Sequence, residues 1–332
     1  MTEAAGHPRD LPLARARALV QRAVDKAEQL GLRGGIAVVG ASGALVTASR
    51  LDHGGPGGMA RATSKAWISA TQQIPSTEHL QRMTTLPAPI STGFVQVSPQ
   101  AVFPGAGGLP VRDDAGVVIA GIAASGATVS PFLPTGIAAE VVSADGEPAN
   151  PEDLLIAYAL GIPYVGQHGD DRARWQARFG DLVVAPQDSL GMVGAPPASM
   201  QPVLQWARDL CDRVISAAAA RGLLVSVTVV DPAGDPVQQD RMDSAPAAGV
   251  DVAHGCASTA ARFGCASEQV AVRYGSATAS LGALHPAPFL AVAGGVPLVV
   301  EGRLVGGLGI GGPPPEVCAE LAALVAAAST TP

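Results

Sequence analysis

The sequence predicts an α+β fold of two tandem units, each a central antiparallel sheet flanked by helices, packed together as an internal pseudo-dimer. Three observations support this prediction. The tripeptide Arg-Leu-Asp at 50–52 recurs as Arg-Met-Asp at 241–243, an offset of 191 residues. Short apolar runs are joined by tight turns, which is typical of hairpins and therefore of antiparallel pairing. Helix-length segments precede and follow the hairpin in each copy.

The first copy shows clear element boundaries. Apolar residues recur at helical intervals from Leu13 to Leu30, and Gly31 is a helix stop. The turn at 41–43 separates two apolar runs, and Pro75 ends the next helical stretch. A further strand pairs with the segment before it across the turn at 113–116. We therefore expect a helix over 13–30, strands over 35–39 and 44–50, a helix over 60–73 and a strand over 117–124.

The second copy repeats this order. Gly222 ends its first helix, a Pro-Ala-Gly turn at 232–234 joins the next two strands, and Glu301-Gly302 forms a later turn. The proline run at 313–315 marks the start of the last helix. We expect helices over 203–220, 250–263 and 316–328, and strands over 223–230, 236–241, 297–300 and 303–310.

The repeat divides the chain into three parts. The first unit spans 10–135, a connecting segment spans 136–198, and the second unit spans 199–330. Within the connection, 151–160 reads as a helix that completes the first unit. The polar stretch 166–188 has no counterpart in the second copy. It is interpreted either as a linker helix or as a lid over a pocket.

Composition narrows the function classes. The 332 residues suit two domains, and 48% apolar content allows sizeable cores, although aromatic residues reach only 4%. A net charge of −7 argues against nucleic-acid binding. No apolar run is long enough to span a membrane, and the polar N-terminus lacks a signal-peptide core. The four cysteines lack zinc spacing, so we expect reduced thiols, a cytoplasmic protein and no metal centre.

Three segments carry a family resemblance. They are the hairpin IAVVGASGALVTASRLD, the helix ARATSKAWISA, and the glycine-rich stretch FPGAGGLPV with the following GVVIAGIAASG. The second copy contains VSVTVVDPAGDPVQQDRMD and AVAGGVPLVVEGRLVGGLGIGG in the same places. These segments resemble the GlcG/HbpS family, also called the haem-degrading or DUF336 family, in two tandem copies.

The resemblance implies several properties. Each unit is expected to be a profilin-like fold, and such units assemble into dimers or octamers, which suggests a homo-oligomer. Some family members bind haem or iron, and a related domain is fused to cobalamin adenosyltransferases. The implied partner is therefore a small molecule, with haem as the one cofactor the resemblance suggests.

The repeated Arg-Asp pairs are candidate ligand-binding residues. Arg50 and Asp52 end one strand, Arg241 and Asp243 end its counterpart, and residues two apart share one face of a strand. Such an arginine could bind an anion while the aspartate orients it. The alternative interpretation is a salt bridge that stabilises the following loop.

Three residues are candidate catalytic groups. Lys65 occupies the family's lysine position, whereas the second copy has Cys256 there, preceded by His254. A desolvated lysine could act as a base or bind a carboxylate. Residues 254 and 256 do not face each other on a helix, so each would need a partner from elsewhere. The alternatives are an ion-paired lysine, a buried small thiol and a helix-surface histidine.

Glycine pairs and one arginine complete the candidate ligand-binding set. Gly107-Gly108 and Gly294-Gly295 match each other but fit no phosphate-loop pattern, so close backbone packing competes with oxyanion binding. Arg112 adds a charge beside Asp113 and could equally be solvated.

Two functions are compatible with these observations. One is small-ligand binding of the GlcG/HbpS type, with haem as a candidate. The other is a cofactor-independent isomerase, lyase or hydratase acting on a small anionic or aromatic metabolite at the cleft between the repeats.

Overall fold

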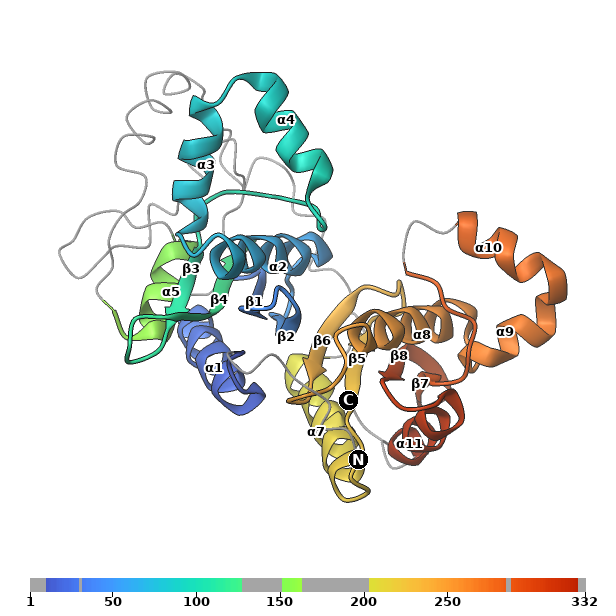
Figure 1. Ribbon diagram of the computed structural model, residues 1–332. Helices are drawn as coiled ribbons and strands as arrows, with labels where there is room; N and C mark the ends of the chain where they lie inside the picture. The colour runs from blue at the N-terminus through green and yellow to red at the C-terminus, as the bar shows by residue number, and fades with distance from the viewer. Residues whose placement is uncertain (1–9, 30–31, 127–150, 163–202, 285–287, 328–332) are drawn as a thin grey trace, which may run out of the picture.

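The computed structural model describes residues 10–29, 32–126, 151–162, 203–284 and 288–327 (Figure 1). The first unit contains α1 (Leu13–Gln29), β1 (Gly35–Gly40), β2 (Leu45–Arg50), α2 (Pro56–Thr71), α3 (Ser76–Thr85), α4 (Ala88–Val97), β3 (Gly108–Arg112), β4 (Val118–Ser125) and α5 (Pro151–Leu160). The second unit contains α7 (Leu204–Ala219), β5 (Ser226–Val230), β6 (Pro236–Arg241), α8 (Gly249–Phe263), α9 (Ser267–Tyr274), η3 (Gly275–Ala277), α10 (Thr278–Leu284), β7 (Gly295–Val300), β8 (Arg303–Gly311) and α11 (Pro315–Ala327). The stretch 166–188, interpreted from the sequence as a linker or a lid, lies outside the described residues.

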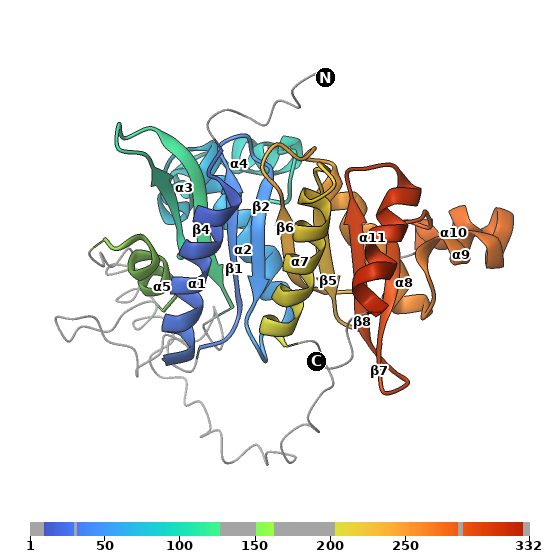
Figure 2. The ribbon, with the colours of Figure 1, turned by 90° about the horizontal axis from the view of Figure 1, so that it is seen from below.

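Both units contribute to one antiparallel sheet with strand order β3-β4-β1-β2-β6-β5-β8-β7. Helices α2 and α8 cover one face of this sheet, and α1, α7 and α11 cover the other (Figures 1 and 2). The helix over 151–160 forms as predicted, and as α5 it packs against α1 and β4. The predicted α+β class and the internal pseudo-dimer are confirmed.

The two units meet where β2 pairs with β6, a junction that we call the seam. Thr47 lies opposite Asp240, and Ser49 lies opposite Gln238. Between them Ala48 lies opposite Gln239, its own counterpart at the 191-residue offset. A pseudo-twofold axis therefore passes through this pair, and the contact is isologous, as in a symmetric homodimer.

Reciprocal helix caps reinforce the seam. The amide of Leu13, at the start of α1, donates to Asp243 Oδ1 at 2.8 Å. Its counterpart Leu204, at the start of α7, donates to Asp52 Oδ1 at 2.9 Å. Each unit thus supplies a carboxylate to an unsatisfied amide at the helix N-terminus of the other unit.

The seam also contains a buried carboxylate. Asp240 is 2% exposed and accepts two hydrogen bonds from the Arg17 guanidinium, at 3.0 and 2.8 Å. Thr47 Oγ1 and Gln238 Nε2 donate to the same carboxylate at 2.8 and 2.9 Å. This bidentate, fully hydrogen-bonded arrangement is the form in which a buried charge is tolerated.

Small residues let the helices approach the sheet closely. A Cβ on Gly121 of β4 would overlap the backbone of α2 at Ala66, and one on Gly309 of β8 would overlap α8 at Ala253. The apolar core clusters of the two units are accordingly built mostly from Ala, Val, Leu and Ile. This packing explains how the chain folds with few aromatic residues.

Two pairs of helices, one pair in each unit, were not predicted from the sequence. Helices α3 and α4 in the first unit and α9 and α10 in the second extend beyond the layer of α2 and α8 (Figure 1). Pro75 was interpreted only as the end of the preceding helix, whereas it also immediately precedes α3, as Pro87 precedes α4. Proline suits a helix start because the first turn needs no amide donor from that residue. Helix α2 likewise begins at Pro56, four residues before the predicted start at 60.

Both edge strands of the sheet carry a proline at matching positions. Pro110 lies in β3 and Pro297 lies in β7, and each has a glycine of the neighbouring strand opposite it. Proline is confined to edges and bulges because it cannot donate to a ladder.

Candidate functional site

A buried ion pair joins three elements of the first unit. Lys65 of α2 is 3% exposed, and its Nζ lies 2.6 Å from Glu152 Oε2 at the start of α5. The same ammonium donates to Ser125 Oγ at 3.1 Å and to the Ala124 carbonyl at 3.4 Å, both at the end of β4. We call Lys65, Ser125 and Glu152 the charge cluster.

Backbone amides hold the acidic side of the charge cluster. Gly126 donates its amide to Glu152 Oε1 at 2.7 Å, and Gly107 donates to the neighbouring Asp153 at 2.6 Å. Gly107 has a φ of 100°, and a Cβ there would lie 2.7 Å from Glu152 Cβ. The glycine is therefore needed for close approach of the loop to α5, and its amide is bonded to a protein carboxylate.

The contacts of Lys65 bear on its chemistry. An ammonium has three protons to donate, and the three acceptors of Lys65 match that number. Protein acceptors therefore occupy all the donor positions of this side chain, which favours a structural role for Lys65.

Phe103 covers the charge cluster. Lys65 Nζ lies 5.8 Å from the centre of its ring, and Arg61 Cζ lies 5.9 Å from it. Arg61 also donates to Ser125 Oγ at 3.4 Å. Two cations therefore lie within cation–π distance of one aromatic ring.

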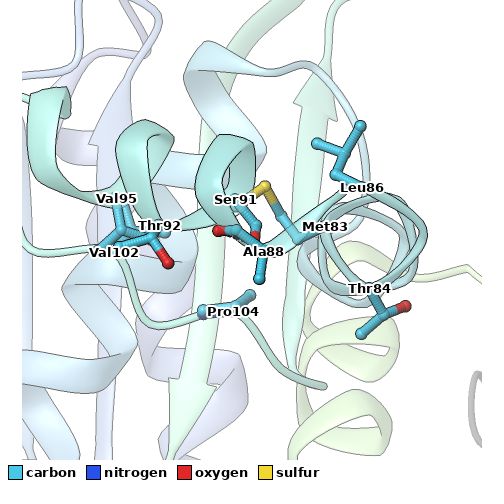
Figure 3. Close-up of a pocket in the computed structure, with 9 residues that line it drawn as sticks. All are labelled: Met83, Thr84, Leu86, Ala88, Ser91, Thr92, Val95, Val102 and Pro104. Carbon is cyan, nitrogen blue, oxygen red and sulfur yellow. Dashed lines mark hydrogen bonds between the residues drawn. The ribbon is translucent and has the colours of Figure 1, made fainter.

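A hollow of about 510 Å³ lies between α3, α4 and the segment 102–104 (Figure 3). Its volume is within the range of small-molecule sites. Most of the lining is apolar, and three residues contribute hydroxyl groups. The lining residues are Met83, Thr84, Leu86, Ala88, Ser91, Thr92, Val95, Val102 and Pro104.

A buried histidine lies beside the hollow on α3. His79 is one helical turn before Met83 on the same side of the helix, and it is 4% exposed. Its ring centre lies 5.2 Å from that of Phe94 on α4. Among the described residues, none hydrogen-bonds to its Nε2. Burial, with a smaller contribution from the charge of Arg82, lowers the pKa of His79 below its usual 6.5, so the imidazole is neutral at pH 7.

The charge cluster is absent from the corresponding place in the second unit. Gly294 is the counterpart of Gly107 and stands beside Cys318, as Gly107 stands beside Glu152. Burial raises the pKa of Cys256 to about 12 and that of Cys318 to about 11, so both are neutral thiols. The three replacements are Cys256 for Lys65, Gly311 for Ser125 and Cys318 for Glu152.

The counterpart of the hollow also differs. Val270 replaces His79, Tyr274 replaces Met83, and Phe289 replaces Val102. The Phe263 ring packs edge-on against those of Tyr274 and Phe289, with centres 5.8 and 5.9 Å apart. Aromatic side chains therefore pack together where the first unit has its hollow.

The sequence matches a known protein family in both units. A family model described as "Haem degrading protein HbpS-like" matches residues 11–131 and 204–327, which together make up most of the sequence. The chain belongs to the HbpS-like family. The two matched regions coincide with the two halves of the sheet, and the family predicted from the sequence is confirmed.

Several solved structures are also similar to this chain. A double mutant of Streptomyces reticuli HbpS is 28% identical and covers 45% of this chain and 99% of its own, with a TM-score of 0.39. Klebsiella pneumoniae ORFY is 21% identical, covering 41% and 94%, with a TM-score of 0.37. A PduOC:heme complex is 27% identical, covering 37% and 90%, with a TM-score of 0.34. No match is found among curated proteins.

The described residues contain neither a membrane-length apolar helix nor a metal-binding cluster. None of the helices there combines the length and apolarity needed to cross a membrane. No group of three or more His, Cys, Asp or Glu side chains within the described ranges is arranged to hold a metal ion.

The candidate catalytic residues of this HbpS-like chain are not brought together. The side-chain contacts of Lys65 come from its own unit. His254 bonds to the backbone of Gly234, within the β5–β6 turn, and burial lowers its pKa. Cys256 instead contacts the carbonyl of Val292. Lys65 contacts β4, which is separated from the seam by β1 and β2. A catalytic cleft between the repeats therefore stays a prediction that these contacts do not support.

The candidate ligand-binding arginines lie at the seam or on the surface. Arg50 Nη2 pairs with Asp231 Oδ2 at 2.7 Å, and both are buried. Arg241 donates to Leu45 O at 2.8 Å, and its Nη2 lies 3.4 Å from Asp10 Oδ2. Asp52 and Asp243 cap helices, as described above. Arg112 donates to the carbonyls of Gly116 and Gln73 on the surface. We assign these charges to structural contacts and leave them out of the proposed site.

Sequence reasoning missed three residues of the site. Glu152 is distant in sequence from Lys65, and its helix has no strong amphipathic pattern. His79 lies on a helix that was not predicted. Phe103 is part of the glycine-rich segment that carried the family resemblance. A comparison of the two copies could have identified His79, because its counterpart is Val270.

Proposed function

We propose that this HbpS-like protein binds one small, largely apolar molecule per chain in the hollow of the first unit, with haem as the first candidate. The family description names haem, and the hollow supplies apolar walls between α3, α4 and 102–104. Apolar concave sites with a few polar groups are the usual form of small-molecule sites.

The residues present fit a haem group. Met83 lines the hollow, and a thioether is a known axial ligand of haem iron. His79 offers a neutral imidazole, the protonation state that binds metals. Bound haem would supply an iron centre for ligation or redox chemistry. The chain itself would hold it by burying its rings and presenting one of these donors.

The observation that carries the proposal is the unpartnered Nε2 of His79. His79 is 4% exposed, and its buried Nε2 loses water without gaining a protein hydrogen bond among the described residues. Such a group costs free energy in the free protein. A ligand that uses this nitrogen would recover that cost.

The differences between the copies support a single site. The imidazole, the thioether and the small valine are all replaced in the second unit, and aromatic rings pack there instead. We therefore expect a saturating stoichiometry of one haem per chain.

Filling the hollow should prevent binding. We expect Val95→Trp to weaken haem affinity at least tenfold, about 1.4 kcal/mol, because the indole occupies the space between α3 and α4. The measurement is a haem titration followed by the Soret band. Val97→Trp is the matched control, since Val97 lies on the same helix, is 81% exposed and does not line the hollow. Equal affinities for the two variants, or no saturable binding by the unaltered protein, would contradict the proposal.

The role of His79 has a separate test. His79→Phe keeps a ring beside Phe94 and removes the nitrogen, so the fold should be retained. We expect the Soret maximum to move and haem affinity to fall at least tenfold. An unchanged spectrum and affinity would show that His79 is not the ligand, and Met83→Leu would then be examined in the same way.

The enzyme hypothesis receives less support. Lys65 has its three protons bound to acceptors, and Cys256 is a neutral thiol whose pKa is raised to about 12. A nucleophilic cysteine needs the opposite condition at neutral pH, a lowered pKa. We therefore do not retain these residues, or His254, as catalytic groups.

A further inference from the structure

The segment 101–104 separates the charge cluster from the hollow. Val102 and Pro104 line the hollow, whereas the intervening Phe103 meets the cations of Lys65 and Arg61. Alternate residues of an extended segment point to opposite sides, which accounts for this arrangement. One wall of the hollow is therefore the reverse side of the surface that covers the charge cluster.

Hydrogen bonds fix the same segment to α2. Ser64 Oγ donates to the Ala101 carbonyl at 2.7 Å and accepts from the Phe103 amide at 2.7 Å. Ser64 is adjacent to Lys65 on α2. The segment is thus held by two neighbouring residues of one helix, through its backbone and through an aromatic ring.

We propose that Lys65 and Phe103 are positioning residues for the ligand hollow: the charge cluster holds the Phe103 ring and thereby sets the wall formed by Val102 and Pro104. Neither residue needs to touch the ligand. The inference rests on the proposed function for its effect on affinity, while its effect on the wall can be measured without any ligand.

The second unit provides independent support, because the whole set is replaced together. The hollow is replaced by packed aromatic rings at the same place, as described above. Leu290 there packs on Gly255, where a Cβ would lie only 2.8 Å from the leucine Cβ. The replacements are Gly255 for Ser64, Cys256 for Lys65, Leu290 for Phe103 and Cys318 for Glu152.

The chemistry of the contact suits a positioning role. A cation–π contact is strongest where the cation is desolvated, and Lys65 is 3% exposed. The ammonium is itself fixed by Glu152 and Ser125, so it cannot move away from the ring at low cost. Loss of the ring should therefore loosen 101–104 without disturbing the ion pair.

The test uses Phe103→Leu, which introduces the residue found in the second unit, and Phe103→Tyr, which keeps the ring. We expect amide hydrogen exchange in 101–106 of the ligand-free protein to accelerate at least fivefold in the leucine variant and to stay within twofold in the tyrosine variant. Haem affinity, measured by Soret titration, should fall at least fivefold for leucine and recover with tyrosine. The double variant Lys65→Met/Glu152→Gln removes the buried cation and leaves only the Arg61 guanidinium near the ring. It leaves no unpaired buried charge, and it should accelerate exchange in the same segment.

The outcomes separate the two proposals. Unchanged exchange in Phe103→Leu, or equal exchange in the leucine and tyrosine variants, would overturn the positioning role whatever the ligand. Accelerated exchange with unchanged haem affinity would show that the position of this wall does not determine ligand binding, which would also overturn the proposal. Accelerated exchange in a protein whose unaltered form binds no haem would uphold the positioning of the wall and refute haem as the ligand.

Discussion

Replacing Lys65 with methionine is expected to lower the free energy of unfolding by about 3–5 kcal/mol, because it leaves the buried Glu152 carboxylate without its cation. Both side chains are less than a tenth exposed, so water cannot compensate the remaining charge. Urea denaturation followed by circular dichroism provides the measurement. The double variant Lys65→Met/Glu152→Gln should recover part of the loss, since it removes the uncompensated charge as well.

An exposed ion pair in the same unit serves as the control for this prediction. Arg82 and Glu78 lie one turn apart on α3, with side chains 62% and 42% exposed. Exposed pairs of this kind contribute about 0–1 kcal/mol. Glu78→Ala should therefore change stability by less than about 1 kcal/mol. A comparable loss in Lys65→Met and Glu78→Ala would show that burial of the charge cluster has no energetic consequence.

Replacing Asp240 with alanine is expected to lower the free energy of unfolding by about 3–5 kcal/mol, since it removes a buried carboxylate with four hydrogen bonds at the seam. Arg17 would keep its charge and lose its bidentate partner. Because the carboxylate bonds to both units, we also expect the weakened seam to separate the unfolding of the two halves. The test is whether probes of the two units still show coincident urea transitions.

The same arginine provides the matched control. Arg17 also pairs with Asp212, whose side chain is 55% exposed. Asp212→Ala removes a carboxylate from the same guanidinium but leaves no buried group unpaired. We expect its effect to stay below about 1 kcal/mol. If both aspartate variants lose equal stability, the seam does not depend on the buried carboxylate.

Much of the fold could be predicted from the sequence, since the repeat and its local patterns are strong signals. The hairpins followed from apolar runs around turns such as 41–43 and 232–234, and the predicted strands β1, β2, β4 and β6 match within one residue at each end. The pseudo-dimer followed from the 191-residue offset. The way in which the two units pair could not be predicted. The pairing of β2 with β6 depends on how the edge strands of two separate units fit together, and neither strand's own sequence specifies it.

The seam also shows contacts of the charged motifs that the sequence did not indicate. Asp52 and Asp243 looked like strand-end partners of arginine, yet they bond to Leu204 and Leu13 of the opposite unit. Nothing local to the motif indicates such a partner. Asp10 was not singled out, although it accepts hydrogen bonds from the turn residue Ser42.

The site was harder to predict than the fold, because its parts are distant in sequence. Lys65 was identified from the resemblance, but its partner Glu152 comes from α5, after a long connection. The contact with Glu152 consequently changed the proposed role of Lys65 from a base to a positioning residue. The hollow lies between two helices that follow prolines, so neither its lining nor His79 was considered. Comparing the copies position by position remains the most informative signal, since function is expected where they diverge.

The prolines at Pro110 and Pro297 limit how copies of this chain can associate. Each interrupts the row of amide donors on an outermost strand, so a strand from another molecule would find an incomplete set of bonds there. The other edge strand of each unit, β2 or β6, is already paired within the chain, because these two strands pair with each other at the seam. Any higher assembly of this protein is therefore expected to grow through its helical layers, and not by lengthening the sheet.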